Sequence, residues 1–398
     1  MDPSNIDFYS YLLYNEAMNI PRYIDIEQSL KPGSVLLLLG PRRSGKTTLL
    51  TRFRNTTQKS VVFYRGDNLS VQHNFSITEE GNLAKLVGNS DVLAIDEAQM
   101  IPNIGKSLKL LVDTRPNLSI VVTGSSAFEL AGQLGEPLTG RKHTHYLLPI
   151  AVAEFVSDSP TPEYFAQKSL DELLVYGSYP STLTHSTTPE KEEFLDELIN
   201  SYLLKDILAF QEIKGSYKLL QLLNLIAHQV GSEVSLSELG SALGIDRKTV
   251  ERYLDLLEKT FVIFRLGGYS RNLRSEVTKM AKYYFYDNGV RNAIIHNFNP
   301  LSIRDDVGLL WENFIVSERQ KRRLYYGPSA NQYFWRTWKG SEIDLVEERD
   351  GKLFGYECKW STRKQVVAPK EWLVTYGNES TWQIINPETF YPFVVPEN

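Results

Sequence analysis

The sequence predicts an α/β protein with an N-terminal three-layer domain on a parallel sheet, a helical middle and a small α/β domain at the C-terminus. Three observations predict this fold class. Apolar runs alternate with helical stretches from about residue 35 to 150, helical spacing follows to about residue 260, and β-rich segments return after about residue 305. The chain has 398 residues, 42% of them apolar, which is more than one core usually serves. We expect four parts: 1–155, 156–230, a winged helix over 231–300, and 301–398.

The strands of the first domain are predicted by its apolar runs. Strands that are apolar throughout belong to parallel sheets covered on both faces. The runs are VLLLL from residue 35, VVFYR from 61, VLAID from 92, SIVVTG from 119 and YLLPI from 146.

A glycine-rich segment follows the first strand and precedes a helical stretch. GPRRSGKT at 40–47 matches G-x-x-x-x-G-K-[ST], whose backbone N–H groups cradle phosphates. Lys46 would reach the β- and γ-phosphates of ATP, and the Thr47 hydroxyl would hold Mg²⁺. The candidate nucleotide-binding residues here are Gly40, Pro41, Arg42, Arg43, Ser44, Gly45, Lys46, Thr47 and Thr48.

Two further strands end in polar side chains. VLAIDEAQ ends its strand in Asp96, which would hold Mg²⁺, and Glu97, which would polarise the attacking water. VVTGSS ends the next strand, and we choose Ser125 over Thr123 as the sensor of the γ-phosphate.

The middle of the chain is predicted to be helical and then to form a winged helix-turn-helix. SLSELGSALGIDRKTVERYLDLLEKTFVIFRLGG, from residue 235, has the order helix, turn, helix and wing. Its second helix is close to neutral, whereas the wing carries five cations. This unit contacts DNA, or it packs the first domain against the last one or against another chain. The cations are Arg265, Arg271, Arg274, Lys279 and Lys282.

The segment SEIDLVEERDGKLFGYECKW, residues 341–360, predicts a β-hairpin. Asp350-Gly351 is a favoured two-residue turn, so Asp344 faces Glu357 and Glu342 faces Lys359. Alternation places these four side chains on one face and apolar residues on the other.

Two facing carboxylates repel unless a cation lies between them. A second divalent cation held by Asp344 and Glu357 would meet this need, and Lys359 would stabilise developing phosphate charge. Alternatively, Glu342 neutralises Lys359 and the pair is structural.

These motifs, together with TGSS, TGRKHTHYLLPIAVAEF and LLWENFIVSE, resemble those of the prokaryotic AAA-type (P-loop) ATP-binding proteins that carry a C-terminal domain of unknown function. The resemblance covers nearly the whole chain. It implies that Arg141, in TGRKH, completes the catalytic site with Lys46 and Glu97, acting on its own nucleotide or on a neighbour's.

The C-terminal pattern resembles the D…[D/E]-x-K signature of restriction-endonuclease-like nucleases. This resemblance implies a nuclease-like fold, active or inactive, in which Glu312 joins Asp344 and Glu357 as a metal ligand. RQKRR, Arg319 to Arg323, then forms a basic patch that could follow a phosphate backbone.

The expected function is Mg²⁺-dependent ATP hydrolysis coupled to rearrangement of the C-terminal half, on or near DNA. The alternatives are an ATP-gated nuclease and a nucleotide-dependent switch that recruits a protein partner or a second copy. The net charge of −5 argues against coating of nucleic acid. Cys358 alone forms no disulfide framework, and no signal or membrane-spanning run is present, so we expect a cytoplasmic protein without membrane contact.

Overall fold

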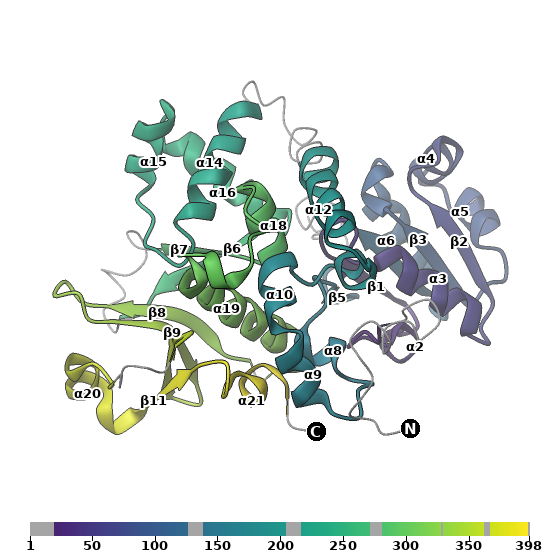
Figure 1. The fold of residues 1–398 in the computed structure, drawn as a ribbon. Helices are drawn as coiled ribbons and strands as arrows, with labels where there is room; N and C mark the ends of the chain where they lie inside the picture. Colours follow the sequence, from purple (N-terminus) through teal and green to yellow (C-terminus); the bar gives the residue numbers. More distant parts are fainter. Residues whose placement is uncertain are drawn as a thin grey trace. The chain divides into compact units, whose positions relative to one another are not determined.

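The computed structural model describes residues 20–125, 138–203, 216–270, 281–327, 329–361 and 367–396. It divides into two compact units, each described here by itself (Figure 1). The nucleotide unit comprises Arg22–Leu148 with Lys259–Phe261, and the C-terminal unit is formed mainly by Pro149–Glu258 and Val262–Asn398. The predicted α/β class, with a parallel sheet first, helices in the middle and a second sheet at the end, is confirmed.

The nucleotide unit is a five-stranded parallel sheet in the order β2-β3-β4-β1-β5. Helices flank the sheet (Figure 1). On one face α2 and α3 cover an apolar cluster that includes Leu36, Ala94 and Val121, all almost completely buried. The elements are α2 (Ile26–Ser29), β1 (Ser34–Leu39), α3 (Lys46–Thr56), β2 (Val61–Arg65), α4 (Leu69–Ser76), α5 (Glu80–Val87), β3 (Val92–Asp96), η2 (Ala98–Met100), α6 (Ile104–Thr114), β4 (Ser119–Gly124) and β5 (Lys142–Tyr146).

The fifth predicted strand is misplaced. The structure has β5 at Lys142–Tyr146, and the run YLLPI begins at its last residue. As an edge strand, β5 is only half-buried and its sequence KHTHY is polar, so the rule for buried central strands missed it. The ladder continues only to the N–H of Leu147, which donates to the carbonyl oxygen of Leu39, the last residue of β1.

The C-terminal unit begins with helices and ends in a six-stranded sheet. Within the described ranges, no helix combines the length and apolar character needed to cross a membrane. Its elements are α8 (Val152–Phe155), α9 (Pro162–Lys168), α10 (Leu170–Tyr176), α11 (Pro180–Thr184), α12 (Thr188–Glu197), η3 (Leu198–Leu203), α14 (Ser216–His228), α15 (Leu236–Leu243), α16 (Arg247–Lys259), β6 (Ile263–Gly268), β7 (Ala281–Phe285), α18 (Asn288–Ile294), η4 (Leu301–Ile303), α19 (Val307–Tyr326), β8 (Asn331–Arg336), β9 (Glu342–Arg349), β10 (Lys352–Cys358), α20 (Lys370–Tyr376), η5 (Gly377–Glu379), β11 (Ser380–Ile385) and α21 (Phe390–Val394).

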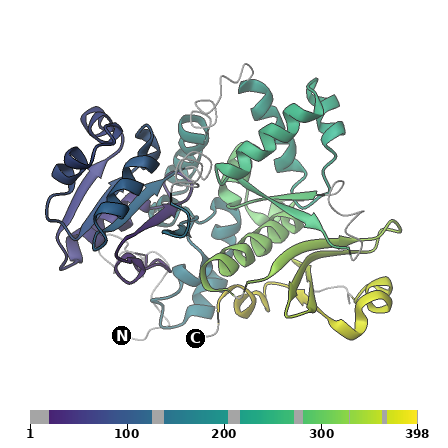
Figure 2. The same cartoon turned by 180° about the vertical axis from the view of Figure 1, so that it is seen from behind.

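The sheet of this unit has the order β11-β10-β9-β8-β6-β7. Helix α19 lies against it (Figure 2), and α20 covers an apolar cluster that contains Trp335, Ile343 and Trp372. The strands expected to form a wing are β6 and β7, and β6 also pairs in parallel with β8. They are therefore two strands of the larger sheet. The boundaries at 230 and 300 remain predictions, since one sheet crosses the second of them.

The predicted register of the β9–β10 hairpin is confirmed from Arg349↔Lys352 to Leu345↔Tyr356. Beyond that pair the predicted alternation is wrong. A register shift against β8 falls between Tyr333 and Trp335, and Ile343 and Val346 pack in the same apolar cluster. A bulge of this kind redirects the side chains around it, so Ile343 and Val346, which strict alternation would place on opposite faces, pack on the same one.

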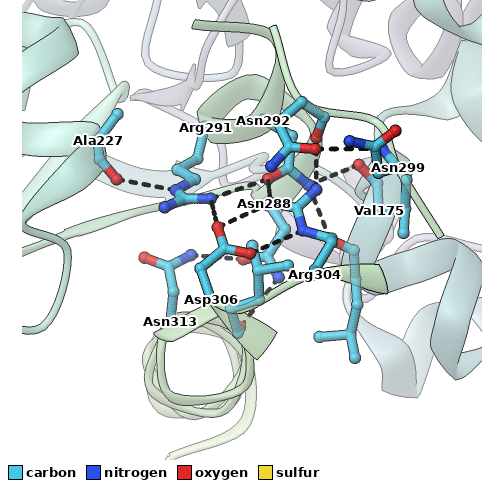
Figure 3. Close-up of polar contacts among 12 residues, drawn as sticks. Val175, Ala227, Asn288, Arg291, Asn292, Asn299, Arg304, Asp306 and Asn313 are labelled. Atoms are coloured by element: carbon cyan, nitrogen blue, oxygen red, sulfur yellow. Dashed lines mark hydrogen bonds and ion pairs between the residues drawn. The ribbon is translucent and has the colours of Figure 1, made fainter. Parts of the chain in front are cut away.

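A buried polar network joins several helices of the C-terminal unit (Figure 3). The Arg304 guanidinium donates to both oxygens of Asp306 at 2.8 Å, and Arg291 forms an ion pair with the same carboxylate. Arg291 also donates to the carbonyl oxygen of Ala227 at 2.8 Å, and Asn292 donates to that of Val175 at 2.8 Å. The network therefore fixes α10, α14 and α18 at the start of α19.

Candidate nucleotide site and C-terminal ionic cluster

The glycine-rich loop has the backbone that its sequence predicts. Gly45 has φ 95°, and a side chain on Gly40 would lie 2.0 Å from the carbonyl oxygen of Leu147, so glycine is required there. Helix α3 begins at Lys46 without a side-chain cap, so its first N–H groups face the loop. This arrangement suits an anionic phosphate.

The cationic and hydroxyl side chains of the glycine-rich loop differ in burial and in their contacts. The buried Lys46 ammonium donates to the carbonyl oxygens of Gly40 at 2.9 Å and Pro41 at 2.7 Å. Ser44 is completely buried, whereas Thr47 and Thr48 are exposed at the start of α3. The partly buried Arg42 and Arg43 complete the loop, and Arg43 has φ 60°.

The acidic residues of β3 meet this loop through hydrogen bonds. The Thr47 hydroxyl donates to Asp96 Oδ2 at 2.8 Å, and the Thr123 hydroxyl donates to Asp96 Oδ1 at 2.5 Å. The N–H of Glu97 donates to Thr123 Oγ1 at 3.0 Å, and Glu97 has φ 53°, in the left-handed region. Four residues from three segments are thus joined in one continuous chain.

Two side chains of this site make contacts that the sequence does not predict. Gln99 is buried between Glu97 and Ser125 and donates to both. Thr123, the residue over which Ser125 is preferred as the γ-phosphate sensor, donates directly to Asp96. The signal for Gln99 was its place in IDEAQ, three positions after Asp96 in the loop that follows the strand.

Arg141 is not near the loop. Its carbonyl oxygen accepts the N–H of Val35, at the start of β1, at 2.9 Å. From Val35 to Gly40 the strand advances about 16 Å at roughly 3.3 Å per residue, which is beyond the reach of an arginine. The guanidinium instead pairs with Asp113, and both side chains are about half-exposed.

In the C-terminal unit, Glu312 of α19 and Asp344 of β9 lie in a buried ionic cluster, which also contains Glu357. Lys282 of β7 reaches this cluster: its ammonium lies 3.5 Å from Glu312 Oε1 and forms an ion pair with Glu342. Lys282 is 1% exposed, so the prediction that it belongs to a DNA-facing wing is wrong. Of the other wing cations, Arg265 is exposed, and Arg271, Arg274 and Lys279 lie outside the described residues.

The predicted pairing of Lys359 is also corrected. Its ammonium lies 2.6 Å from Glu357 Oε1, while Glu342 pairs with Lys282. Asp344 Oδ2 accepts the N–H of Cys358 at 2.8 Å. At this point the side chain of Asp344 takes the place of a main-chain carbonyl of β9, and the β9–β10 ladder ends. Each carboxylate therefore has a partner from the chain itself.

Burial and mutual repulsion govern ionisation in the cluster. Burial raises the pKa of Glu312 to about 8, the Asp344 charge adds to this, and Lys282 opposes it. Burial raises the pKa of Glu357 to about 7, again with Asp344 adding and the bond from Lys359 opposing. Burial also raises the pKa of Asp344, against the effect of Lys282.

A second divalent cation does not fit the cluster as it is folded. Among the described residues, no group of three or more His, Cys, Asp or Glu side chains is placed to hold a metal ion. The Lys282 ammonium already lies beside Glu312 and Glu342 and supplies the positive charge there.

The predicted basic patch at Arg319–Arg323 is wrong. Arg319 is buried and donates to both oxygens of Glu347 at 2.7 Å. Lys321 is buried and donates to Glu318 at 2.7 Å, and Arg322 donates to the carbonyl oxygen of Phe393 at 2.7 Å. These cations stabilise the unit internally. Arg319 and Arg322 donate to the main chain of α21, and Arg319 also pairs with β9, whereas Lys321 contacts Glu318 and the carbonyl oxygen of Ile150.

Comparison with known protein families finds a match over the residues that form the nucleotide site. Residues 32–156 match a family described as an AAA domain. Residues 167–301 and 307–383 match two families described as Domain of unknown function (DUF8612) and Domain of unknown function (DUF4143). The first match covers the glycine-rich loop, the acidic pair and the sensor strand, so the nucleotide unit is an AAA-type, ATPase-like nucleotide-binding domain.

Similar proteins are found in distant organisms. An uncharacterized protein of Mycobacterium tuberculosis is 27% identical over 339 residues, which cover 84% of this chain and 72% of that protein. One from Methanocaldococcus jannaschii is 25% identical over 339 residues, covering 81% and 74%. A solved structure of RuvB from Thermotoga maritima covers 62% of this chain and 84% of that chain at 18% identity, with a TM-score of 0.28, which is too low to bear on fold or function.

Proposed function

We propose that this protein binds ATP with Mg²⁺ in its AAA-type domain and hydrolyses it there. The observation that carries the proposal is the hydrogen-bonded chain that joins Thr47, Asp96, Thr123 and Glu97 beside the glycine-rich loop. Hydrolysis of a phosphoanhydride needs positioning and charge stabilisation more than covalent chemistry. This arrangement would supply the positioning, and Lys46 with bound Mg²⁺ would supply the positive charge.

The roles of the residues around the glycine-rich loop follow from their positions. Bound Mg²⁺–ATP supplies the γ-phosphoryl group and the divalent charge that stabilises it. Lys46 holds phosphate oxygens once it leaves the loop carbonyls, and Thr47 and Asp96 hold the metal. Glu97 accepts a proton from the attacking water, and Ser125 donates to the γ-phosphate.

We place Arg141 in the site of a neighbouring copy. Its distance from the loop of its own unit excludes a role in the same site, whereas its half-exposed side chain is accessible to a second molecule. An arginine supplied across an interface stabilises the charge of the transferred phosphoryl group.

We also propose that hydrolysis rearranges the C-terminal unit. The Arg22 guanidinium donates to the carbonyl oxygens of Ser44 and Leu148, both at 2.7 Å, so it links the glycine-rich loop to the last residue before Pro149. A shift of the loop on nucleotide binding would therefore pull on the point where the chain leaves the nucleotide unit.

The first residues of the C-terminal unit are in turn held to α19. The N–H of Val152 donates to Glu318 Oε2 at 2.7 Å, and Lys321 donates to the carbonyl oxygen of Ile150 at 3.3 Å. All of these groups are buried, so a displacement at Ile150 is opposed by a charged pair and is passed to the helix.

We keep DNA as the proposed partner of the C-terminal unit. The support is local: Arg247 and Lys248 are exposed at the start of α16, the second helix of the predicted helix-turn-helix. A gel shift with duplex DNA that weakens as salt rises would support this partner. Binding of a protein without any such shift would favour the switch that recruits a protein.

A nuclease activity of the C-terminal unit is a second candidate function. It is favoured because Glu312, Asp344 and Glu357 lie in one cluster, with Lys359 paired to Glu357. Lys282 counts against it, because it takes the place in which a metal would be needed. The readout is cleavage of labelled DNA in Mn²⁺ by the wild type and by Glu357→Ala. Product that depends on Glu357 would support a nuclease, and no product would leave the ATPase alone.

The ATP site itself is tested by equilibrium binding of a fluorescent ATP analogue. Lys46→Ala should weaken binding at least about tenfold, because it removes the cation that meets the phosphates. Lys59→Ala, an exposed lysine of the same unit, is the matched control and should bind as the wild type does. Equal binding by Lys46→Ala would contradict the proposed site.

A further inference from the structure

Gln99 connects the two residues that we expect to meet the water and the γ-phosphate. It belongs to η2 and is 8% exposed. Its Nε2 donates to Ser125 Oγ at 3.0 Å and to Glu97 Oε2. These two acceptors fix the orientation of the amide, because turning it over would place its oxygen against the Glu97 carboxylate.

Stability does not explain this arrangement. The Oε1 atom of Gln99 is buried and has no hydrogen-bond partner among the residues that the structure describes. Burying an unpaired carbonyl oxygen costs free energy, and an apolar side chain of similar size would avoid that cost. A buried group kept at such a cost beside a reaction site points to a function for its N–H groups.

The backbone of Glu97 shows a related feature. Glu97 has φ 53°, a conformation that is unfavourable for a side chain of this kind, and its N–H is held by Thr123 at 3.0 Å. Thr123 therefore fixes the main chain of Glu97, and Gln99 fixes its carboxylate. The position of the expected base depends on both contacts.

We propose that Gln99 is a positioning residue that relays the state of Ser125 to the carboxylate of Glu97; this inference rests on the proposed ATPase function. Because Ser125 Oγ accepts a hydrogen bond from Gln99, its own proton can be donated to a γ-phosphate oxygen. The second N–H of Gln99 holds one oxygen of Glu97 and leaves the other to accept a proton from water. The connection runs from phosphate through Ser125 and Gln99 to Glu97.

The direct test is steady-state phosphate release by Gln99→Glu. This change keeps the size of the side chain, removes the N–H groups and adds a charge beside Glu97. The turnover number should fall about tenfold or more, as expected when a general base is misplaced, while KM for ATP stays within about twofold. Gln28→Glu, an exposed position of α2, controls for the added charge and should leave turnover unchanged.

The pH dependence of turnover by Gln99→Glu distinguishes a role of Gln99 in the relay from a role in packing alone. At lower pH the introduced carboxyl group takes up a proton and can donate again, so the ratio of variant to wild-type turnover should rise as pH falls toward about 6. A packing defect would instead lower the melting temperature and leave this ratio flat, and that result would overturn the proposal.

A double-mutant cycle with Ser125→Ala tests the chain of contacts. If Gln99 acts through Ser125, the double variant should lose little more turnover than the more damaged single variant. Additive losses would overturn the relay. The ATPase function is tested separately: the wild type should release phosphate, and Lys46→Ala should abolish that release. If the ATPase is established in this way and Gln99→Glu turns over as fast as the wild type, only the relay is contradicted. No phosphate release by the wild type would remove the ATPase and the relay together.

Discussion

The role of a charged residue in this protein depends on what the fold places next to it. Lys282 is almost completely buried between Glu312 and Glu342, although the sequence places it in a basic stretch that looks exposed. The carboxylates that face it come from α19 and β9, which lie 30 and 60 residues further along the chain. No local pattern predicts such a contact, so the sequence suggested a metal where the fold provides a lysine.

The raised pKa of Glu312 makes stability depend on pH. With a folded pKa of about 8 against 4.5, the folded state keeps a proton that the unfolded state loses. The resulting stability is present below pH 4.5 and is lost as pH rises through about 8. The Tyr284 hydroxyl donates to Glu312 Oε1 at 2.8 Å. Glu312→Gln should flatten the pH dependence, because the amide does not titrate and its oxygen can still accept this hydrogen bond.

Urea unfolding followed by tryptophan fluorescence measures this effect. All 6 tryptophans lie between Trp311 and Trp382, so the signal reports on the C-terminal unit. Midpoints of the wild type and Glu312→Gln should converge at low pH and separate at pH about 8, with the variant more stable. Parallel midpoints across this range would show that Glu312 titrates as an ordinary exposed carboxyl group.

At the scale of elements, the sequence predicts what local physics determines. Strands β1, β3 and β4 are buried throughout and largely apolar, as expected of strands covered on both faces, and the β9–β10 register follows from its turn. The edge strand β5, the union of β6 with β8 and the bulge in β9 depend on partners that are remote in sequence, so local periodicity could not place them. The same holds for the nucleotide site, where motifs identified Lys46 and Asp96 but not the contact of Gln99.

The hairpin turn gives a prediction at this scale. Asp350 and Gly351 both have positive φ, 51° and 73°, as a two-residue turn of the favoured hairpin type requires. Gly351→Ala should lower the unfolding free energy by about 1 kcal/mol, because only glycine tolerates this conformation without strain. Gly308→Ala in α19, where a side chain meets nothing within 4 Å, is the control and should be neutral or stabilising. Equal stability of both variants would contradict the turn.

The buried polar network at the start of α19 gives a second prediction at the scale of elements. Burial disfavours the charge of Asp306, but hydrogen bonds from Arg304 and Arg291 outweigh it and lower its pKa to about 2. Its stabilisation is present above pH 3.8 and is lost as pH falls through about 2. Asp306→Asn should cost about 3 kcal/mol at neutral pH, because it leaves two arginines short of a partner. The exposed neighbour Asp305→Asn should cost almost nothing, and similar urea midpoints for the two variants would exclude the network as a major support.

At the scale of the whole molecule, our proposal is that Arg141 completes the nucleotide site of a neighbouring copy. We therefore expect Arg141→Ala and Lys46→Ala to be inactive alone and to complement each other when mixed. If copies associate at random, an equimolar mixture should recover about a quarter of wild-type turnover. A mixture that stays inactive at high protein concentration would mean that Arg141 does not act on a neighbouring copy.

We expect ATP to be hydrolysed beside Glu97, and phosphate release by Glu97→Gln measures whether it is. The amide keeps the shape of the side chain but cannot accept a proton from water, so turnover should fall about 100-fold or more while ATP binding is unchanged. Wild-type turnover in this variant, or the absence of Mg²⁺-dependent phosphate release by the wild-type protein, would contradict the claim.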